Sequence, residues 1–220
     1  MSIILNIDTA VQSSSICLAE NDKPIGAKTN LLYRESAAWL HTAIKDLLDA
    51  NNFSLEQLDA IAVTEGPGSY TGLRVGMATA KGFCYALDKP LITINTLVLM
   101  AFAAKNACTG YLCPMIDARR MEVFTAIFDS YLNYVLQPTN LILNDTSFKS
   151  ILEKNPMVFF GNGSVKFQNL IKHPHALFAN IETDAQSMTS LSYQNFLENK
   201  YTDLAYSQPF YGKDFHSLSN

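Results

Sequence analysis

The turn between residues 64 and 76 has residue types that could do chemistry. It reads EGPGSYTGLRVG from Glu65 to Gly76 and joins a short apolar run at 59–64 to a long, nearly uncharged segment. Glycines let the backbone bend tightly and leave bare N–H groups ahead of the helix that follows. These donors could bind an anion or meet another chain, and the sequence leaves both open. The residues of this glycine turn are Gly66, Gly68, Ser69 and Gly72.

Known catalytic patterns do not fit the glycine turn. A Walker loop needs Gly-Lys-Ser/Thr after four residues and a dinucleotide fingerprint needs Gly-x-Gly-x-x-Gly, and the turn has neither. The chain also lacks the Gly-x-Ser-x-Gly elbow and the His-Glu-x-x-His pair of common hydrolases. Ser69 has no histidine close in sequence, so a nucleophilic role for it is not favoured.

The composition indicates a folded protein that does not hold a nucleic acid by itself. Of 220 residues, 48% are apolar, and the net charge is -4 with a pI near 5.5. Nucleic-acid-binding domains usually carry a basic face, whereas here only Arg119 and Arg120 are adjacent basic residues. The start lacks a secretory signal and no apolar run reaches about twenty residues, so we expect a cytoplasmic protein without membrane contact.

The cysteines are interpreted as core residues. They form no Cys-x-x-Cys pair, and a reducing compartment disfavours disulfides. Neither a zinc site nor a disulfide framework is therefore expected. The four are Cys17, Cys84, Cys108 and Cys113.

Two stretches of different pattern predict two subdomains. Up to residue 108 the element order is β-β-β-α-β-α-β-α, which favours a mixed sheet with helices on both faces. A second β-rich unit begins after Gly110, so we predict subdomains at 1–108 and 109–220 without a free hinge. The predicted strands are 3–7, 14–19, 25–32, 59–64, 91–94, 111–116, 122–128, 134–136 and 157–160. The predicted helices are 36–50, 72–87, 96–106, 148–153, 164–171 and 184–197, with fraying after 210.

Five segments together resemble the TsaB (YeaZ-type) family of bacterial tRNA threonylcarbamoyladenosine biosynthesis proteins. They are Ile4–Thr9, Ala62–Gly76, Lys89–Leu91, Pro114–Arg119 and Gln208–Tyr211. The resemblance implies an actin-like (ASKHA, RNase H-type) α/β fold in two subdomains. It also implies a non-catalytic scaffold that forms a homodimer alone and pairs with a TsaD-like catalytic subunit and a TsaE-like ATPase. That complex transfers a threonylcarbamoyl group to the adenosine beside the anticodon of tRNAs reading codons that start with A.

The resemblance also allows a test for a metal site. TsaD proteins carry an Asn-His-x-x-x-His motif, and the matching run here is Asn-Thr-Leu-Val-Leu-Met at 95–100. Thr96 and Met100 stand at the two histidine positions, and neither is a good ligand for a hard or borderline divalent ion. His173 and His175 have no third ligand near in sequence, which favours a solvated loop. We therefore expect no intrinsic metal or cofactor, with metal and ATP or ADP handled by partner subunits.

Asp8 and Thr9 are the weak candidates for nucleotide binding. They end the first predicted strand, where actin-like ATPases hold phosphate or magnesium. Residues 10–13 offer no lysine or glycine to cradle a phosphate, so a turn or capping role is favoured. A second polar cluster, interpreted as an ion-paired strand end or as a contact to a partner or tRNA, consists of Asp117, Arg119, Arg120 and Glu122.

If the chain lacks catalytic groups, the helix after the glycine turn becomes the main candidate for a functional surface. An apolar seam runs along it at spacings of four and three residues, and its only charges are Arg74 and Lys81. One side must pack on the sheet, and the other must meet a neighbour unless helix 36–50 covers it. Either the seam or the side that carries Val75, Ala78, Gly82 and Tyr85 could form this contact. The seam consists of Leu73, Met77, Ala80, Cys84 and Leu87.

The seam hypothesis predicts that Ala80→Arg or Met77→Glu keeps the fold but abolishes pairing. Trp39 on helix 36–50 could anchor a partner or lie in the core. That helix departs from many TsaB sequences, because Glu35 stands where a histidine is usual and His41 where a proline often lies. The predicted interface residues are Trp39, Leu73, Arg74, Met77, Ala80, Lys81, Cys84 and Leu87.

Two other functions stay open beside the scaffold. An actin-like ATP-dependent small-molecule kinase would need ATP hydrolysis that depends on Asp8 and magnesium. A metallopeptidase-like hydrolase would need bound zinc or iron, which Thr96 and Met100 disfavour.

Overall fold

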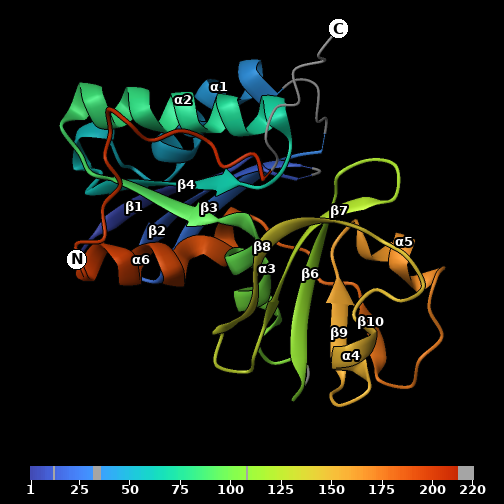
Figure 1. The fold of residues 1–220 in the computed structure, drawn as a ribbon. Helices are drawn as coiled ribbons and strands as arrows, with labels where there is room; N and C mark the ends of the chain where they lie inside the picture. Colours follow the sequence, from blue (N-terminus) through green and yellow to red (C-terminus); the bar gives the residue numbers. More distant parts are fainter. Residues whose placement is uncertain (12, 32–35, 108, 213–220) are drawn as a thin grey trace, which may run out of the picture. The chain divides into compact units, whose positions relative to one another are not determined.

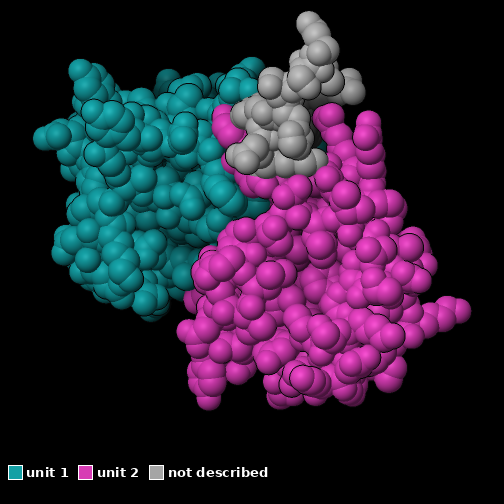
Figure 2. Space-filling model, viewed as in Figure 1, with its two compact units in different colours: residues 1–99, 183–210 teal, residues 100–182, 211–220 magenta. Residues whose placement is uncertain are grey.

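The chain folds into two units. The structure is a computed structural model that describes residues 1–11, 13–31, 36–107 and 109–212. The first unit contains residues 1–99 and 183–210, and the second contains 100–182 and 211–220 (Figure 2). The predicted boundary near 108 is therefore wrong, and the chain returns to the first unit after residue 182. The return has a physical reason, because Ala185 and Met188 are fully buried on one face of the first unit's sheet.

The first unit is built on a mixed five-stranded sheet in the order β3-β2-β1-β4-β5. β1 pairs antiparallel with β2 and parallel with β4, which is the mixed pairing predicted from the order of elements. β1 and β4 are buried nearly throughout, as expected for apolar runs covered on both faces. The strands are β1 (Ile3–Asp8), β2 (Ser14–Glu20), β3 (Lys23–Asn30), β4 (Ala60–Gly66) and β5 (Leu91–Asn95).

Helices cover both faces of this sheet (Figure 1). α1 and α2 lie on one face, where they share a hydrophobic core with Leu5 and Ile7 of β1. η3 and α6 cover the opposite face, where their apolar side chains share a second hydrophobic core with Ile4 of β1. Alternate side chains of β1 thus enter two different cores, as the pleat of a strand requires. The helices are α1 (Ser36–Ala50), η2 (Leu55–Gln57), α2 (Tyr70–Leu87), α3 (Thr96–Ala104), η3 (Ala185–Met188) and α6 (Thr189–Leu197).

The second unit has its own five-stranded sheet in the order β10-β9-β6-β7-β8. Phe159 and Phe167 lie 4.8 Å apart, centroid to centroid, within its aromatic core. β8 extends beyond the predicted 134–136, and it accommodates Pro138 because it is an edge strand. The elements are β6 (Tyr111–Asp117), β7 (Glu122–Phe128), β8 (Tyr134–Ile142), α4 (Lys149–Leu152), β9 (Met157–Phe160), α5 (Ser164–Gln168) and β10 (Ala176–Ala179).

The predicted α/β architecture with mixed sheets and flanking helices is confirmed. β10 was not predicted, because its four residues, ALFA, are half-buried or exposed and show no clear alternation. Within the described part of the chain, no helix has both the length and the apolar character that a membrane span requires.

Candidate functional site

The glycine turn is held by hydrogen bonds within the chain. Ser69 caps α2, because its Oγ accepts a hydrogen bond from the N–H of Gly72 at 3.1 Å. The N–H of Ser69 donates to the carbonyl of Ala10 at 2.7 Å, and Thr9 Oγ1 donates to the carbonyl of Gly72 at 2.8 Å. Two N–H groups that could have met an anion are therefore used by the chain itself.

Close packing explains why the turn needs glycines. A methyl group on Gly68 would overlap the carbonyl oxygen of Ala10, and one on Gly72 would overlap that of Thr9. Gly66 has a φ of +115° and lies against the carbonyl of Phe210, whose N–H donates to Glu65 at 2.7 Å. The turn is the place where the segments after β1, after β4 and near residue 210 meet.

A pair of glycine substitutions tests this packing. We expect Gly72→Ala to lower the free energy of unfolding by about 1–3 kcal/mol, because the methyl group forces the Thr9 backbone to move. Gly82→Ala is the matched control, since it lies in the same helix with no atom near its added methyl group. It should stabilise the fold by about 0.5–1 kcal/mol through helix propensity. Urea unfolding of both variants checks the pair, and equal effects would contradict the packing argument.

Asp8 is a buried carboxyl group at the same junction. Its Oδ1 accepts hydrogen bonds from Thr64 Oγ1 at 2.9 Å and from the N–H of Ala10 at 3.0 Å. Burial raises the pKa of Asp8, and the negative charge of Asp184 adds to the shift. Burial therefore makes the ionised carboxylate less favourable here than in water, and its hydrogen bonds to Thr64 and Ala10 offset only part of this cost.

Asp8→Asn is expected to stabilise the protein at neutral pH. The folded-state pKa of Asp8 is raised above 3.8, so the carboxyl's contribution to stability is fully present below 3.8. It is lost as the pH rises through the window between the unfolded and folded pKa values. Asparagine keeps an acceptor oxygen for Thr64 and Ala10 but does not titrate.

Thermal unfolding across that pH range measures the effect. The variant should melt higher than the wild type at pH 7, and the gap should close as the pH falls toward 3.8. The exposed Asp49→Asn serves as the control. A wild type that gains stability over the variant with rising pH would contradict the raised pKa.

The seam of α2 faces inward, which corrects the predicted interface. Leu73, Met77, Ala80 and Cys84 are buried, with exposures of 0–3%. Met77, Ala80 and Cys84 pack in one core with β1, β4 and α1, and Leu87 is half-buried. The seam is therefore already covered by the chain's own residues and is not an exposed contact surface.

Two other predicted interface residues also have partners within the chain. Lys81 Nζ donates to the carbonyls of Ala205 and Ser207 at 3.3 and 2.9 Å, and so holds the C-terminal segment along α2. Trp39 is half-buried and packs against the core of the first unit, which agrees with the alternative interpretation of a core residue. Arg34 and Glu35 lie outside the described residues.

The remaining side of α2 is exposed, and we call it the outer face. Residues on it recur at spacings of three and four, so they lie along one line of the helix. Tyr85 is 84% exposed, whereas Val75 is half-buried against the core. Arg74 places its guanidinium 4.0 Å from the centre of the Tyr70 ring. The outer face consists of Thr71, Arg74, Ala78, Gly82 and Tyr85.

α1 lies beside α2 but leaves the outer face uncovered. The rings of His41 and Phe83 lie 5.8 Å apart, which places α1 along the flank of α2 (Figure 1). Both helices contribute to the same core, so α1 covers the sheet and not the outer face. The predicted alternative, a contact through Ala78, Gly82 and Tyr85, is the one with an exposed surface.

Comparison with known proteins identifies the family. Residues 21–208 match the family model of TsaD, tRNA N6-adenosine threonylcarbamoyltransferase. The chain is 30% identical to the tRNA threonylcarbamoyladenosine biosynthesis protein TsaB of Escherichia coli strain K12, over 94% of this chain and 93% of that protein. The chain belongs to the TsaB family. The TsaB of Bacillus subtilis strain 168 is also 30% identical, over 77% of this chain and 75% of that protein.

A solved structure agrees with the family's fold. A crystal structure described as an uncharacterized protein with similarity to peptidase YEAZ from Pseudomonas aeruginosa has a TM-score of 0.84 and 23% identity. The match covers 97% of this chain and 100% of that chain. The predicted actin-like ASKHA fold, shared by TsaB and TsaD proteins, is confirmed.

The TsaD metal does not fit the residues of this TsaB-family chain. Thr96 and Met100, at the expected ligand positions of α3, are buried, with exposures of 0% and 3%. A hydroxyl and a thioether are poor ligands for a divalent metal in place of two imidazoles. Among the residues that the structure describes, no three His, Cys, Asp or Glu side chains are grouped to hold one ion. His175 Nδ1 lies 2.7 Å from the Leu152 carbonyl instead.

The cysteines of this TsaB-family chain are core residues where they are described. Cys17, Cys84 and Cys113 are free and buried. Burial raises the pKa of each thiol to about 12, so each stays protonated at neutral pH. Cys108 lies outside the described residues.

Proposed function

We propose that this chain is a non-catalytic subunit of a tRNA threonylcarbamoyladenosine-forming complex. It binds a TsaD-like catalytic subunit and activates it, in cooperation with a TsaE-like ATPase. The partner subunits hold the metal and the ATP or ADP. The observation that carries the proposal is the outer face of α2, an exposed helix surface with one charged residue, in a chain of the TsaB family.

The outer face has the shape for a helix–helix contact. Ala78 and Gly82 are small residues one turn apart, so the backbone of a second helix can approach closely. Tyr85 offers a large, exposed ring at one end, and Arg74 offers a charge at the other. A TsaD-like subunit with the same kind of helix would present a similar face. The same surface would pair two copies of this chain when the partner is absent.

The residues at the positions where a kinase or a metalloenzyme would bind its metal support an accessory role. Asp8 is buried, hydrogen-bonded to Thr64 and Ala10, and has a raised pKa, so it is poorly suited to a kinase-type magnesium site. Thr96 and Met100 replace the histidines that a metallopeptidase-like or TsaD-like centre would use. The chain's contribution would then be to bind and to position its partner.

Reconstitution tests the proposal. TsaD-like and TsaE-like proteins, ATP, a threonylcarbamoyl donor and tRNA are combined with and without this chain, and modified adenosine is measured by mass spectrometry. We expect modification only in the complete mixture and no ATP hydrolysis by this chain alone. Full modification without the chain would overturn the scaffold role. Magnesium-dependent ATP hydrolysis by the chain alone, abolished in Asp8→Asn, would support the kinase instead.

A further inference from the structure

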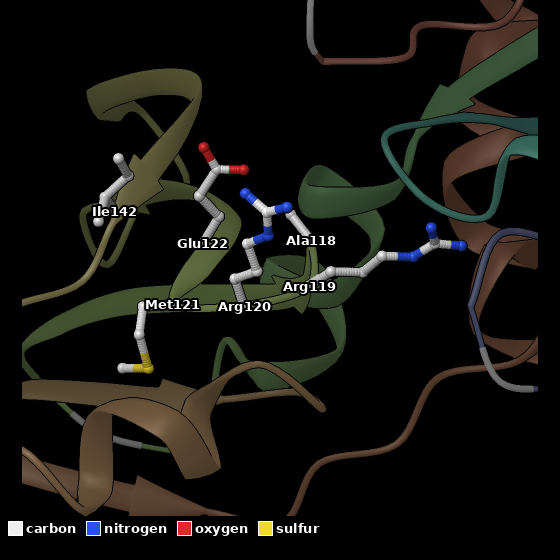
Figure 3. Close-up of a pocket in the computed structure, with 6 residues that line it drawn as sticks. All are labelled: Ala118, Arg119, Arg120, Met121, Glu122 and Ile142. Atoms are coloured by element: carbon white, nitrogen blue, oxygen red, sulfur yellow. The ribbon is translucent and has the colours of Figure 1, made fainter.

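The turn between β6 and β7 forms a pocket in the second unit. Its volume is about 490 Å³, within the roughly 300–1,000 Å³ typical of small-ligand sites. One wall belongs to the turn itself, and the other comes from the end of β8 (Figure 3). The lining residues are Ala118, Arg119, Arg120, Met121, Glu122 and Ile142.

Two arginines occupy backbone conformations that suit other residues better. Arg119 has a φ of 70° and Arg120 a φ of 47°. Glycine or asparagine adopts this left-handed region at lower cost, so arginine is not the choice that the turn itself favours. Strained positions of this kind persist where the side chain serves another purpose. Here both arginines are among the residues that line one pocket.

Asp117, the last residue of β6, is already paired. Asp117 Oδ1 accepts hydrogen bonds from Lys166 Nζ at 2.7 Å and from the N–H of Arg119 at 2.6 Å. Burial alone would raise the pKa of Asp117, but the hydrogen bond from Lys166 and the backbone N–H of Arg119 outweigh it and lower the pKa. Asp117 therefore stays ionised, with Lys166 as its direct partner and the positive charge of Arg119 as a further favourable interaction.

The rest of the pocket combines apolar surface with one carboxylate. Met121 is 39% exposed and Ile142 is 64% exposed, so apolar side chains are accessible at its wall. Figure 3 shows Arg120 and Glu122 pointing to the same side of the turn, and Arg119 extending in another direction. A flat guanidinium can stack on a base, a second can bind a phosphate, and a carboxylate can accept a hydrogen bond from a base amino group.

We propose that this pocket binds an unpaired nucleotide of the tRNA substrate. The proposal rests on the proposed function, because it assumes that the complex containing this chain holds tRNA. An acidic peptide suits the pocket less well, since its carboxylates offer no flat base to stack on a guanidinium or to donate an amino hydrogen bond to Glu122. The net charge of -4 means that the pocket adds to binding by the whole complex and does not make the isolated chain an RNA-binding protein.

The double variant Arg119→Asn/Arg120→Asn tests the pocket in the assembled complex. Asparagine tolerates the left-handed conformation, so the fold should be kept or stabilised while both charges are lost. We expect the affinity of the complex for fluorescently labelled tRNA, measured by anisotropy, to fall about tenfold. The dependence of log K on log salt should become shallower by about 1, because one of the two guanidinium groups is assigned to a phosphate. The control is Lys172→Ala, which removes one exposed charge from the same unit outside the pocket.

The outcomes separate this proposal from the function on which it rests. If the wild-type complex modifies tRNA and the double variant binds tRNA like the wild type, the pocket proposal is overturned. The same holds if the variant assembles poorly with its protein partners but the residual complex keeps its tRNA affinity, since the pocket would then bind protein. If the wild-type mixture lacks any dependence on this chain, the proposed function itself fails. A tRNA-specific loss with normal assembly and a melting temperature at or above the wild type supports the nucleotide site.

Discussion

Replacing Ala80 by arginine is expected to unfold most of the protein. Ala80 is fully buried in the core that α2 shares with β1, β4 and α1. Arginine would bury a charge without a partner and would need space that a packed core lacks. The expected loss is at least about 3–5 kcal/mol, a large part of the 5–15 kcal/mol of a typical domain. Circular dichroism and urea unfolding of the purified chain measure it.

The matched control for this change is Ala78→Arg. Ala78 lies two residues earlier on the same helix, but its side chain is exposed on the outer face. We expect its free energy of unfolding to stay within about 0.5 kcal/mol of the wild type. An Ala80→Arg variant as stable as Ala78→Arg would show that the seam does not face the core. Because Met77 and Ala80 are both buried, Met77→Glu and Ala80→Arg are expected to disrupt the fold, contrary to the prediction from the sequence that they leave it intact.

Ala78→Arg is also expected to abolish pairing with a TsaD-like subunit. A long charged side chain at the centre of the outer face would hold a second helix away from Gly82 and leave a charge in the contact. We expect the dissociation constant to rise at least about 100-fold, which corresponds to about 2.7 kcal/mol. Isothermal titration calorimetry measures this pairing, and light scattering of the chain alone should show loss of the homodimer.

The control for assembly is Ala103→Arg. It introduces the same side chain at an exposed position of another helix, α3. Its affinity for the partner should equal that of the wild type. If Ala78→Arg remains folded and still pairs normally, the outer face is not the interface. The proposed function would then lose the observation on which it rests.

Local sequence signals were sufficient for most elements of the fold. Alternating or continuous apolar runs identified β1, β4, β7 and β9 because their side chains meet a core at a fixed period. The glycine turn before α2 and the Asp-Lys-Pro segment that follows Leu87 located that helix to within two residues. The motifs of the same segments also indicated the family, which the comparisons confirmed.

The meaning of the glycine turn was decided by tertiary contacts. Glycines indicate a tight turn or a close approach, but a sequence does not name the atom that approaches. In the structure the neighbours are the carbonyls of Thr9, Ala10 and Phe210, from segments far apart along the chain. The glycine turn therefore packs against the chain's own backbone, which is neither of the two alternatives, an anion or another chain, that the sequence had left open.

The sequence by itself determined the order of most elements, the glycine turn and a helix with almost no charge. Only the tertiary structure decided that Ala80 faces the core and Ala78 faces outward, and that residues 183–210 return to the first unit. The reason is that α2 carries apolar or small side chains on both of its faces. Its periodicity therefore does not show which face packs on the sheet. That choice depends on strands and on a C-terminal segment that are remote in sequence and adjacent in space.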